Sequence, residues 1–184
     1  PCGQAKRPLC YGTDPSGTGT VEDTGKGRPP LPAPATEADV SGVEVADVNG
    51  DGIADLIVLT HAPHPSYVYL NPGDGDFSGV TPTEIGTGGI GSSCDDCHST
   101  SAAVADVNGD GVVDLIVGND GTSNMIYLGV PAPQSAFPAT GTGDFSAITG
   151  LPFGSTNGPT TDVEVGDIDG DGAPDIAVAN DGAP

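Results

Sequence analysis

Short apolar stretches alternate with glycine-rich polar turns along the chain. In "VEVAD" (43–47) apolar and polar residues alternate with a period of two, which predicts a half-buried strand. The apolar runs "DLIV" (55–58) and "YVYL" (67–70) are bounded by Gly, Pro and Asn and are typical of short buried strands. A weaker fourth strand is expected near Phe77, and near Phe145 in the later counterpart of this stretch.

This order of strands returns about every 60 residues. The motif "DVNGDGIADLIV" recurs as "DVNGDGVVDLIV" and "DIDGDGAPDIAV", with steps of 59 and 61 residues, and tyrosines of the third strand recur every 58 residues. Four strands in about 60 residues is the size of a β-propeller blade, so we predict an all-β fold of about three tandem four-stranded blades. The markers are Asp47, Asp106 and Asp167 for the loop, and Tyr11, Tyr69 and Tyr127 for the strand.

The repeats are out of phase with the two ends of the sequence. The predicted division is the C-terminal half of a blade over 1–40, whole blades over 41–100 and 101–160, and the N-terminal half of a blade over 161–184. Three blades are too few to close a ring, because propellers typically have at least four. We therefore expect the half-blades to be completed by more of the same repeat or by a neighbouring identical subunit. Such a head-to-tail contact gives a ring when the rotation closes and an open fibre when it does not.

The last repeat resembles a known family. The stretch "FGSTNGPTTDVEVGDIDGDGAPDIAVANDGAP" (153–184) is similar to the FG-GAP repeat, also described as the VCBS-type repeat, of integrin α-chain propellers and many secreted adhesion proteins. Its namesake ends are Phe153-Gly154 and Gly182-Ala183-Pro184. The resemblance covers the three loops with their flanking strands, and it implies propeller blades that carry calcium in an extracellular or cell-surface protein.

Each repeat contains an acidic loop of the form D-x-[DN]-x-D-G-x-x-D, over residues 47–55, 106–114 and 167–175. Side-chain oxygens at positions 1, 3, 5 and 9 and the carbonyl at position 7 converge on one point when the backbone curls. Calcium takes six to eight such oxygens, whereas magnesium prefers a tight octahedron with retained waters. An EF-hand is excluded, because it needs Glu at position 12, where this chain has valine each time. The predicted ligands of three Ca²⁺ ions are Asp47, Asn49, Asp51, Ile53 and Asp55; Asp106, Asn108, Asp110, Val112 and Asp114; and Asp167, Asp169, Asp171, Ala173 and Asp175.

The chain is strongly acidic. With 26 Asp and Glu against 4 Lys and Arg, its net charge is −22. Such a surface repels nucleic acid and anionic membranes and attracts cations. The longest apolar run, 56–59, is far too short to cross a bilayer, so no membrane insertion is expected. No Ser/His/Asp grouping, phosphate loop or basic patch is apparent, and the acids are committed to the loops, so we do not expect an enzyme.

Four cysteines form two local pairs. An even count in a secreted chain predicts two disulfides. The expected bonds are Cys2–Cys10, across a turn of the N-terminal half-blade, and Cys94–Cys97, in the connection before the second full repeat.

The second cysteine pair has an alternative interpretation. Cys94-Asp-Asp-Cys97-His98 matches the C-x-x-C-H pattern of c-type haem attachment, in which His98 is the proximal ligand. Zinc or a free thiol is a further alternative. The candidate distal haem ligands are His61, His64 and Met125.

Three functions follow from these features. The first is a non-enzymatic, calcium-binding extracellular protein for adhesion or for a structural filament. The second is a glycan- or protein-binding propeller fragment of a larger secreted or receptor protein. The third is an electron-transfer module with a covalently attached haem.

Overall fold

The computed structural model describes most of the 184-residue chain. For residues 10–13 and 19–22 it describes the backbone alone. Within the described residues all regular structure is β-strand, and no helix there is long and apolar enough to cross a membrane. The described residues are 10–13, 19–22, 40–61, 63–86, 98–133, 140–154 and 159–182. The strands are β1 (Cys10–Thr13), β2 (Gly19–Glu22), β3 (Val40–Ala46), β4 (Asp55–Thr60), β5 (Tyr67–Tyr69), β6 (Thr83–Glu84), β7 (His98–Ala105), β8 (Asp114–Asp120), β9 (Asn124–Tyr127), β10 (Leu151–Phe153), β11 (Thr160–Gly166) and β12 (Asp175–Asn180).

These strands form antiparallel sheets of consecutive hairpins. The first four-stranded sheet has the order β3-β4-β5-β6 and the second has the order β10-β9-β8-β7. The β1–β2 and β11–β12 pairs each form a two-stranded sheet. The predicted all-β fold with four-stranded antiparallel sheets is therefore confirmed. Neither a closed ring nor the number of repeats is established by the part of the chain that the structure describes.

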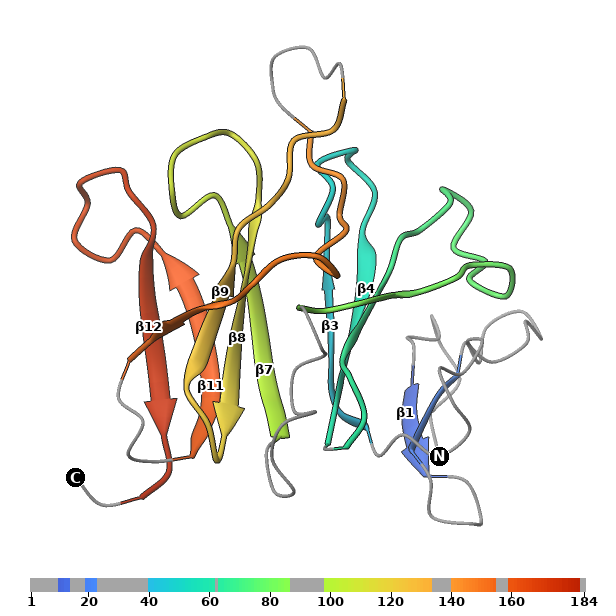
Figure 1. Ribbon diagram of the computed structural model, residues 1–184, viewed down its shortest axis with the longest axis horizontal. Coiled ribbons are helices and arrows are strands. Elements are labelled where there is room, and N and C mark those ends of the chain that lie inside the picture. Colours follow the sequence, from blue (N-terminus) through green and yellow to red (C-terminus); the bar gives the residue numbers. More distant parts are fainter. Residues whose placement is uncertain are drawn as a thin grey trace, which may run out of the picture.

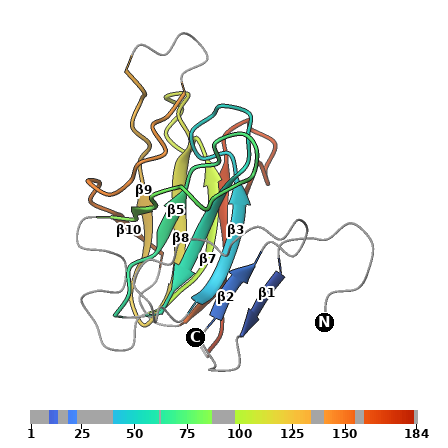
Figure 2. The ribbon, with the colours of Figure 1, turned by 90° about the vertical axis from the view of Figure 1, so that its right-hand side faces the viewer.

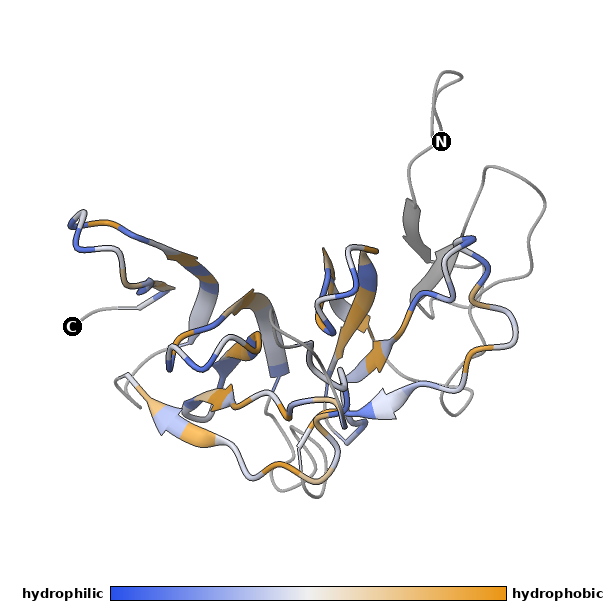
Figure 3. Ribbon diagram, turned by 90° about the horizontal axis from the view of Figure 1, so that it is seen from above, coloured by the Kyte–Doolittle hydropathy of each residue, from blue (hydrophilic) through white to orange (hydrophobic). Residues whose placement is uncertain are grey.

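The sheets stand in a row with their first strands adjacent. β3 contacts β7, and β7 contacts β11. Figure 1 shows this row running from the β11–β12 pair to the β1–β2 pair. In Figure 2, which looks along the row, the sheets stand behind one another, and from above they follow an arc (Figure 3). This arrangement is the one expected for neighbouring propeller blades.

Hydroxyl groups join the first strands of neighbouring sheets. The Thr100 hydroxyl donates to the Thr160 carbonyl oxygen at 2.7 Å, and the Ser101 hydroxyl donates to a carboxylate oxygen of Asp162 at 2.7 Å. The Ser41 hydroxyl donates to the Ser99 carbonyl oxygen in the same way between β3 and β7. These bonds satisfy polar groups along the joints between the sheets.

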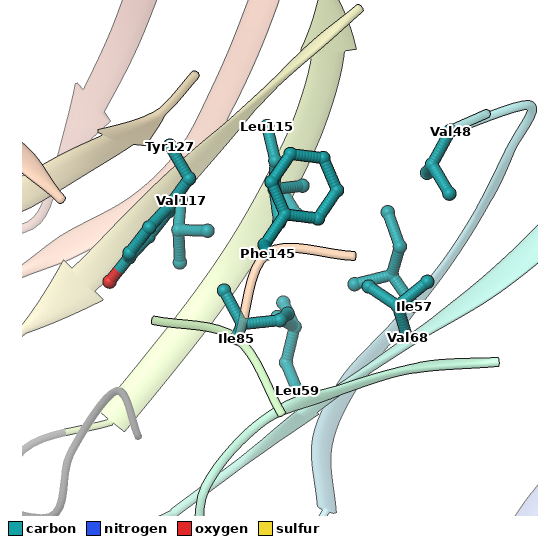
Figure 4. Close-up of a cluster of buried hydrophobic side chains, with 10 residues drawn as sticks. Val48, Ile57, Leu59, Val68, Ile85, Leu115, Val117, Tyr127 and Phe145 are labelled. Atoms are coloured by element: carbon teal, nitrogen blue, oxygen red, sulfur yellow. The ribbon is translucent and has the colours of Figure 1, made fainter. Parts of the chain in front are cut away.

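Most of the buried apolar surface lies between the two four-stranded sheets. Ile57 and Leu59 of β4 belong to the same buried cluster as Leu115 and Val117 of β8 (Figure 4). Phe145, from the connection between β9 and β10, joins them and is 1% exposed. A single sheet of short strands cannot cover its own apolar face, so each sheet depends on its neighbour.

The other face of the first sheet carries a second apolar cluster. Successive side chains of a strand point to opposite faces, so Leu56 and Val58 lie on the face away from the second sheet. They pack with Tyr67 and Tyr69, and the Tyr69 ring meets the edge of Phe77 at a centroid distance of 6.5 Å. The first sheet is therefore buried on both faces, which explains why "DLIV" is a continuous apolar run.

The first three predicted strands of both whole repeats are present, but the fourth lies later in the chain than predicted. Leu56 pairs with Tyr69, and Leu115 pairs with Tyr127 in the same register, which matches the tyrosine spacing of the sequence. The fourth strands are β6 and β10, not segments near the two phenylalanines. At Phe145 the carbonyl oxygen accepts the N–H of Ile148 at 3.1 Å, so this segment is a turn that delivers a core side chain.

Phe145 lies between the two four-stranded sheets, and replacing its ring tests whether the packing there stabilises the fold. Phe145→Ala should lower the free energy of unfolding by about 3–5 kcal/mol, because it removes a fully buried ring and leaves a cavity. The measurement is denaturant unfolding at constant calcium. Ile168→Ala is the control, because Ile168 is 71% exposed and its loss should change stability by about 0.5 kcal/mol or less. Equal effects of the two substitutions would contradict this packing.

Candidate metal-binding loops

The three acidic loops connect the first and second strands of their sheets. They follow β3, β7 and β11, and all three lie at the same end of the sheets, the upper end in Figure 1. In the first loop Gly50 and Gly52 have φ angles of 75° and 86°. Other residues rarely adopt this left-handed conformation, so glycine at positions 4 and 6 allows the chain to curl around its own side chains.

The first aspartate of each loop is the centre of this curl. Asp47 accepts the N–H groups of Gly50 at 2.8 Å and of Asp51 at 3.1 Å on one oxygen, and that of Gly52 at 2.8 Å on the other. Asp106 accepts the three equivalent bonds at 2.7–3.0 Å. Such bonds hold the carboxylate in place and satisfy the backbone donors of the turn.

The ninth position has a second role that the motif alone does not reveal. Asp55 is 1% exposed, and its two oxygens accept the N–H of Val48 at 3.0 Å and the N–H of Asn71 at 2.8 Å. Asn71 lies two residues after the end of β5, so this carboxylate ties the loop to the end of the third strand. The same carboxylate therefore closes the loop and aligns three strands.

Asp114 repeats this tie in the second sheet. It accepts the N–H of Val107 at 2.9 Å and of Gly129 at 2.8 Å, and it is 0% exposed. A Cβ at Gly129 would lie 2.3 Å from the Val113 carbonyl oxygen, so only glycine lets the backbone approach. Sequence reasoning missed Asn71 and Gly129. The only signal for them was their place two residues after the repeated tyrosines.

The third loop gathers the densest negative charge. Ligand oxygens of Asp167, Asp169 and Asp175 lie within 4.8 Å of one another. In the first two loops the third position is asparagine, and the Asn49 amide donates to Asp51 at 2.9 Å. The side chain of Asp169 has no N–H to donate, so the third loop lacks this neutralisation by a side-chain amide. Asp171 lies outside the three-carboxylate group and accepts the N–H of Ala173 at 2.8 Å.

No Lys or Arg among the residues that the structure describes offsets this charge, because the sequence contains none after residue 28. Burial raises the pKa of Asp55, and the nearby Asp51 and Asp47 carboxylates raise it further, against the lowering effect of its two backbone donors. The pKa of Asp114 is raised for the same reasons. Among the described residues, negative charge in these loops is therefore balanced by backbone N–H groups and, in the first two loops, by one asparagine side-chain amide each, unless a cation binds.

The donor set fits calcium. Each loop offers carboxylate and amide oxygens on one short curled segment, and hard divalent cations with oxygen ligands are bound in this way. The group of Asp167, Asp169 and Asp175 is a possible metal site on distance alone. The identity of the ion, the number of sites and the ligand role of the Ile53, Val112 and Ala173 carbonyls stay predictions.

A hollow of about 210 Å³ between β3, β7 and β11 is also acidic. Glu44 and Glu164 line it together with Ser101, further residues of these strands and Ile57 of β4. The pKa of Glu44 is raised, mainly by burial and then by the charges of Asp162 and Glu164. Anionic ligands are therefore disfavoured there as well as at the loops.

The predicted cysteine chemistry falls almost entirely outside the described residues. Cys2, Cys94 and Cys97 lie beyond them, and only the backbone of Cys10 is described, so both disulfides stay predictions. Of the candidate distal haem ligands, the structure brings His61 to His98, with ring centroids 4.1 Å apart. Met125 instead packs against the core between the sheets.

Together, these features define a class: repeats of four-stranded antiparallel sheets with an Asp/Asn-rich loop between the first two strands. A family profile described as FG-GAP-like repeat matches residues 47–117 and 118–178, which is more than half of the chain. The chain belongs to this FG-GAP-like repeat family, as its motifs predict. A search of curated proteins found no match.

The tie made by Asp55 can be separated from calcium binding by measuring stability in EDTA. Asp55→Asn should lower the free energy of unfolding by about 1–3 kcal/mol even without metal, because an amide accepts on only one side and leaves a buried N–H unpaired. Asp51→Asn is the matched control. Asp51 is exposed, so its loss should matter little in EDTA and should weaken calcium binding instead. The account is wrong if both variants unfold alike without metal.

Proposed function

We propose that this protein is a non-enzymatic, calcium-stabilised extracellular repeat protein that serves in adhesion or in a structural assembly. The observation that carries the proposal is the set of three oxygen-rich loops at one end of adjoining sheets. Membership of the FG-GAP-like repeat family supports a binding or adhesion role for such sheets. The alternative role, ligand binding by a fragment of a larger secreted or receptor protein, stays a prediction.

Calcium has a structural task in this proposal. Each loop fixes the hairpin between the first two strands, and the ninth-position carboxylate also reaches the third strand in the first two sheets. An ion that binds only the folded loop stabilises the fold by mass action. Extracellular modules bind calcium with dissociation constants of about 10⁻⁴–10⁻³ M, which suits a calcium-rich exterior.

Assembly is supported by the β11–β12 pair. Ile176 and Val178 occupy the positions of Leu115 and Val117, which are 0% exposed in the second sheet, yet they are only half-buried. Ala177 is exposed, whereas its counterparts Ile57 and Ile116 are 0% exposed. We propose that further strands cover this pair, either from a neighbouring subunit or from more of the same repeat.

The distribution of charge supports a head-to-tail contact. Residues 1–39 carry all 4 basic residues and 5 of the 26 acids, a net charge of 4 − 5 = −1. Residues 40–184 carry the other 21 acids and no Lys or Arg, a net charge of −21. Of all parts of a second copy, the N-terminal segment is therefore the one that the acidic β11–β12 end repels least.

Removing calcium tests the proposed role of the loops. A site with a dissociation constant near 10⁻³ M should contribute about 1.4 kcal/mol at about 10 mM calcium, or about 4 kcal/mol for three sites. The melting temperature should therefore rise by about 10 °C between EDTA and 10 mM calcium. Magnesium at the same concentration is the control and should stabilise less. A melting temperature that does not respond to calcium would refute the role.

Charge placed on the open face of β12 should block assembly. Ala177→Lys leaves the pair itself intact, because the new ammonium group lies opposite Glu164 across the strands. It should reduce the sedimenting mass of the assembled protein to that of the monomer. Ala147→Lys is the control, since Ala147 is exposed in a turn away from this face. A monomeric wild type at all concentrations, or normal assembly of the Ala177→Lys variant, would count against subunit contact through β12.

A further inference from the structure

Two histidines from different sheets meet at the end opposite the acidic loops. His61 follows β4 directly, and His98 is the first residue of β7. The two residues form an isolated antiparallel bridge between the sheets. Their rings lie with centroids 4.1 Å apart and planes inclined by 42°. Residues far apart in the sequence therefore place two imidazoles side by side at the joint between the first and second sheets.

One nitrogen of this pair needs a partner. The Nδ1 atom of His98 is buried and has no hydrogen-bond partner among the described residues. A buried polar atom without a partner costs free energy, because it has given up its bonds to water. An imidazole nitrogen can be satisfied by a hydrogen bond or by a metal ion, and histidine is the commonest protein ligand for transition metals.

The overall charge of the protein favours a cation over an anion at this joint. The chain carries a net charge of −22, and none of its 4 basic residues follows residue 28. Imidazole nitrogens are poor ligands for calcium but suit zinc, copper, nickel and iron. The chemistry of this joint is therefore different from that of the acidic loops.

We propose that His61 and His98 are two imidazole ligands of one transition-metal centre between the first and second four-stranded sheets. The proposal does not rest on calcium binding by the loops or on assembly. The centre links β4 to β7 at the end of the joint where no acidic loop is present. It links the two sheets in addition to the apolar cluster and the hydrogen bond from Ser41 to Ser99.

The ring positions constrain how the metal is held. Metal–nitrogen bonds to histidine are about 2.0–2.1 Å, so two nitrogens on opposite sides of one ion lie about 4 Å apart and their ring centroids lie further still. Two rings that approach an ion from the same side at a right angle have centroids about 4.5 Å apart, so the observed 4.1 Å is near this arrangement and binding requires a small outward shift of the rings. An iron porphyrin with one histidine on each face requires the rings to move apart. The Cys94-x-x-Cys97-His98 motif makes haem iron a second source of the same imidazole–metal chemistry, and the experiment separates the two.

The test uses the full chain with excess calcium, so that the acidic loops are filled. Equilibrium dialysis against zinc or cobalt measures metal bound per chain, and an absorption spectrum of the protein as purified detects haem. Wild type should bind one equivalent of zinc, and His61→Gln and His98→Gln should each weaken binding at least tenfold. His64→Gln is the matched control and should bind as wild type does, because it keeps the same loop and removes only an unrelated imidazole.

Each result decides the proposal. Stoichiometric metal that is lost in both His61→Gln and His98→Gln but kept in His64→Gln supports it, with a free ion as the source. A haem spectrum that changes in His61→Gln but not in His64→Gln also supports it, with porphyrin iron as the source. Absence of both metal and haem, or binding that is unchanged in His61→Gln, overturns it. Calorimetric melting of each variant in calcium verifies that the sheets remain folded.

Discussion

The structure depends on how negative charge is accommodated in three short loops. Each loop gathers carboxylates on one curled segment, and no Lys or Arg follows residue 28 to neutralise them. Hydrogen bonds within the loops supply the compensation that the described residues provide, and Asp47 and Asp106 each receive three backbone N–H groups. The curl that offers these N–H groups also turns the chain from the first strand of a sheet into the second. The charged side chains, the turn and the sheet therefore depend on one another, and in our proposal a bound cation neutralises the remaining negative charge.

The packing of the sheets follows from their small size. Each sheet has short strands and few aromatic side chains, so it is buried by its neighbours and not by a large core of its own. Phe145, Ile57 and Leu115 show this directly, because they come from different sheets and connections and are fully buried together. The β11–β12 pair has the same pattern of apolar residues without the same cover. This contrast, and not the family resemblance, is the physical reason for expecting a further partner there.

Much of the fold could be predicted because the same sequence pattern occurs three times in the chain. Period-two alternation located β3, apolar runs located β4 and β5, and recurring tyrosines gave the repeat length. The fourth strands were misplaced, because aromatic residues mark burial and not strand pairing, and Phe145 is buried from a turn. The loop residues were visible as a motif, but the tie from Asp55 to Asn71 was not, since it joins positions 16 residues apart through a backbone N–H. The contact of His61 with His98 depends on how two sheets meet, which no local pattern encodes.

The central claim is that the three loops are calcium sites, and counting bound calcium tests it most directly. Isothermal titration of the metal-free chain should show about three calcium ions per chain, with dissociation constants of about 10⁻⁴–10⁻³ M. The double substitution Asp167→Asn and Asp169→Asn should reduce the count to two and leave the other sites unchanged. A metal-free chain that binds no calcium at these concentrations, or a double variant that still binds three ions, would contradict the account.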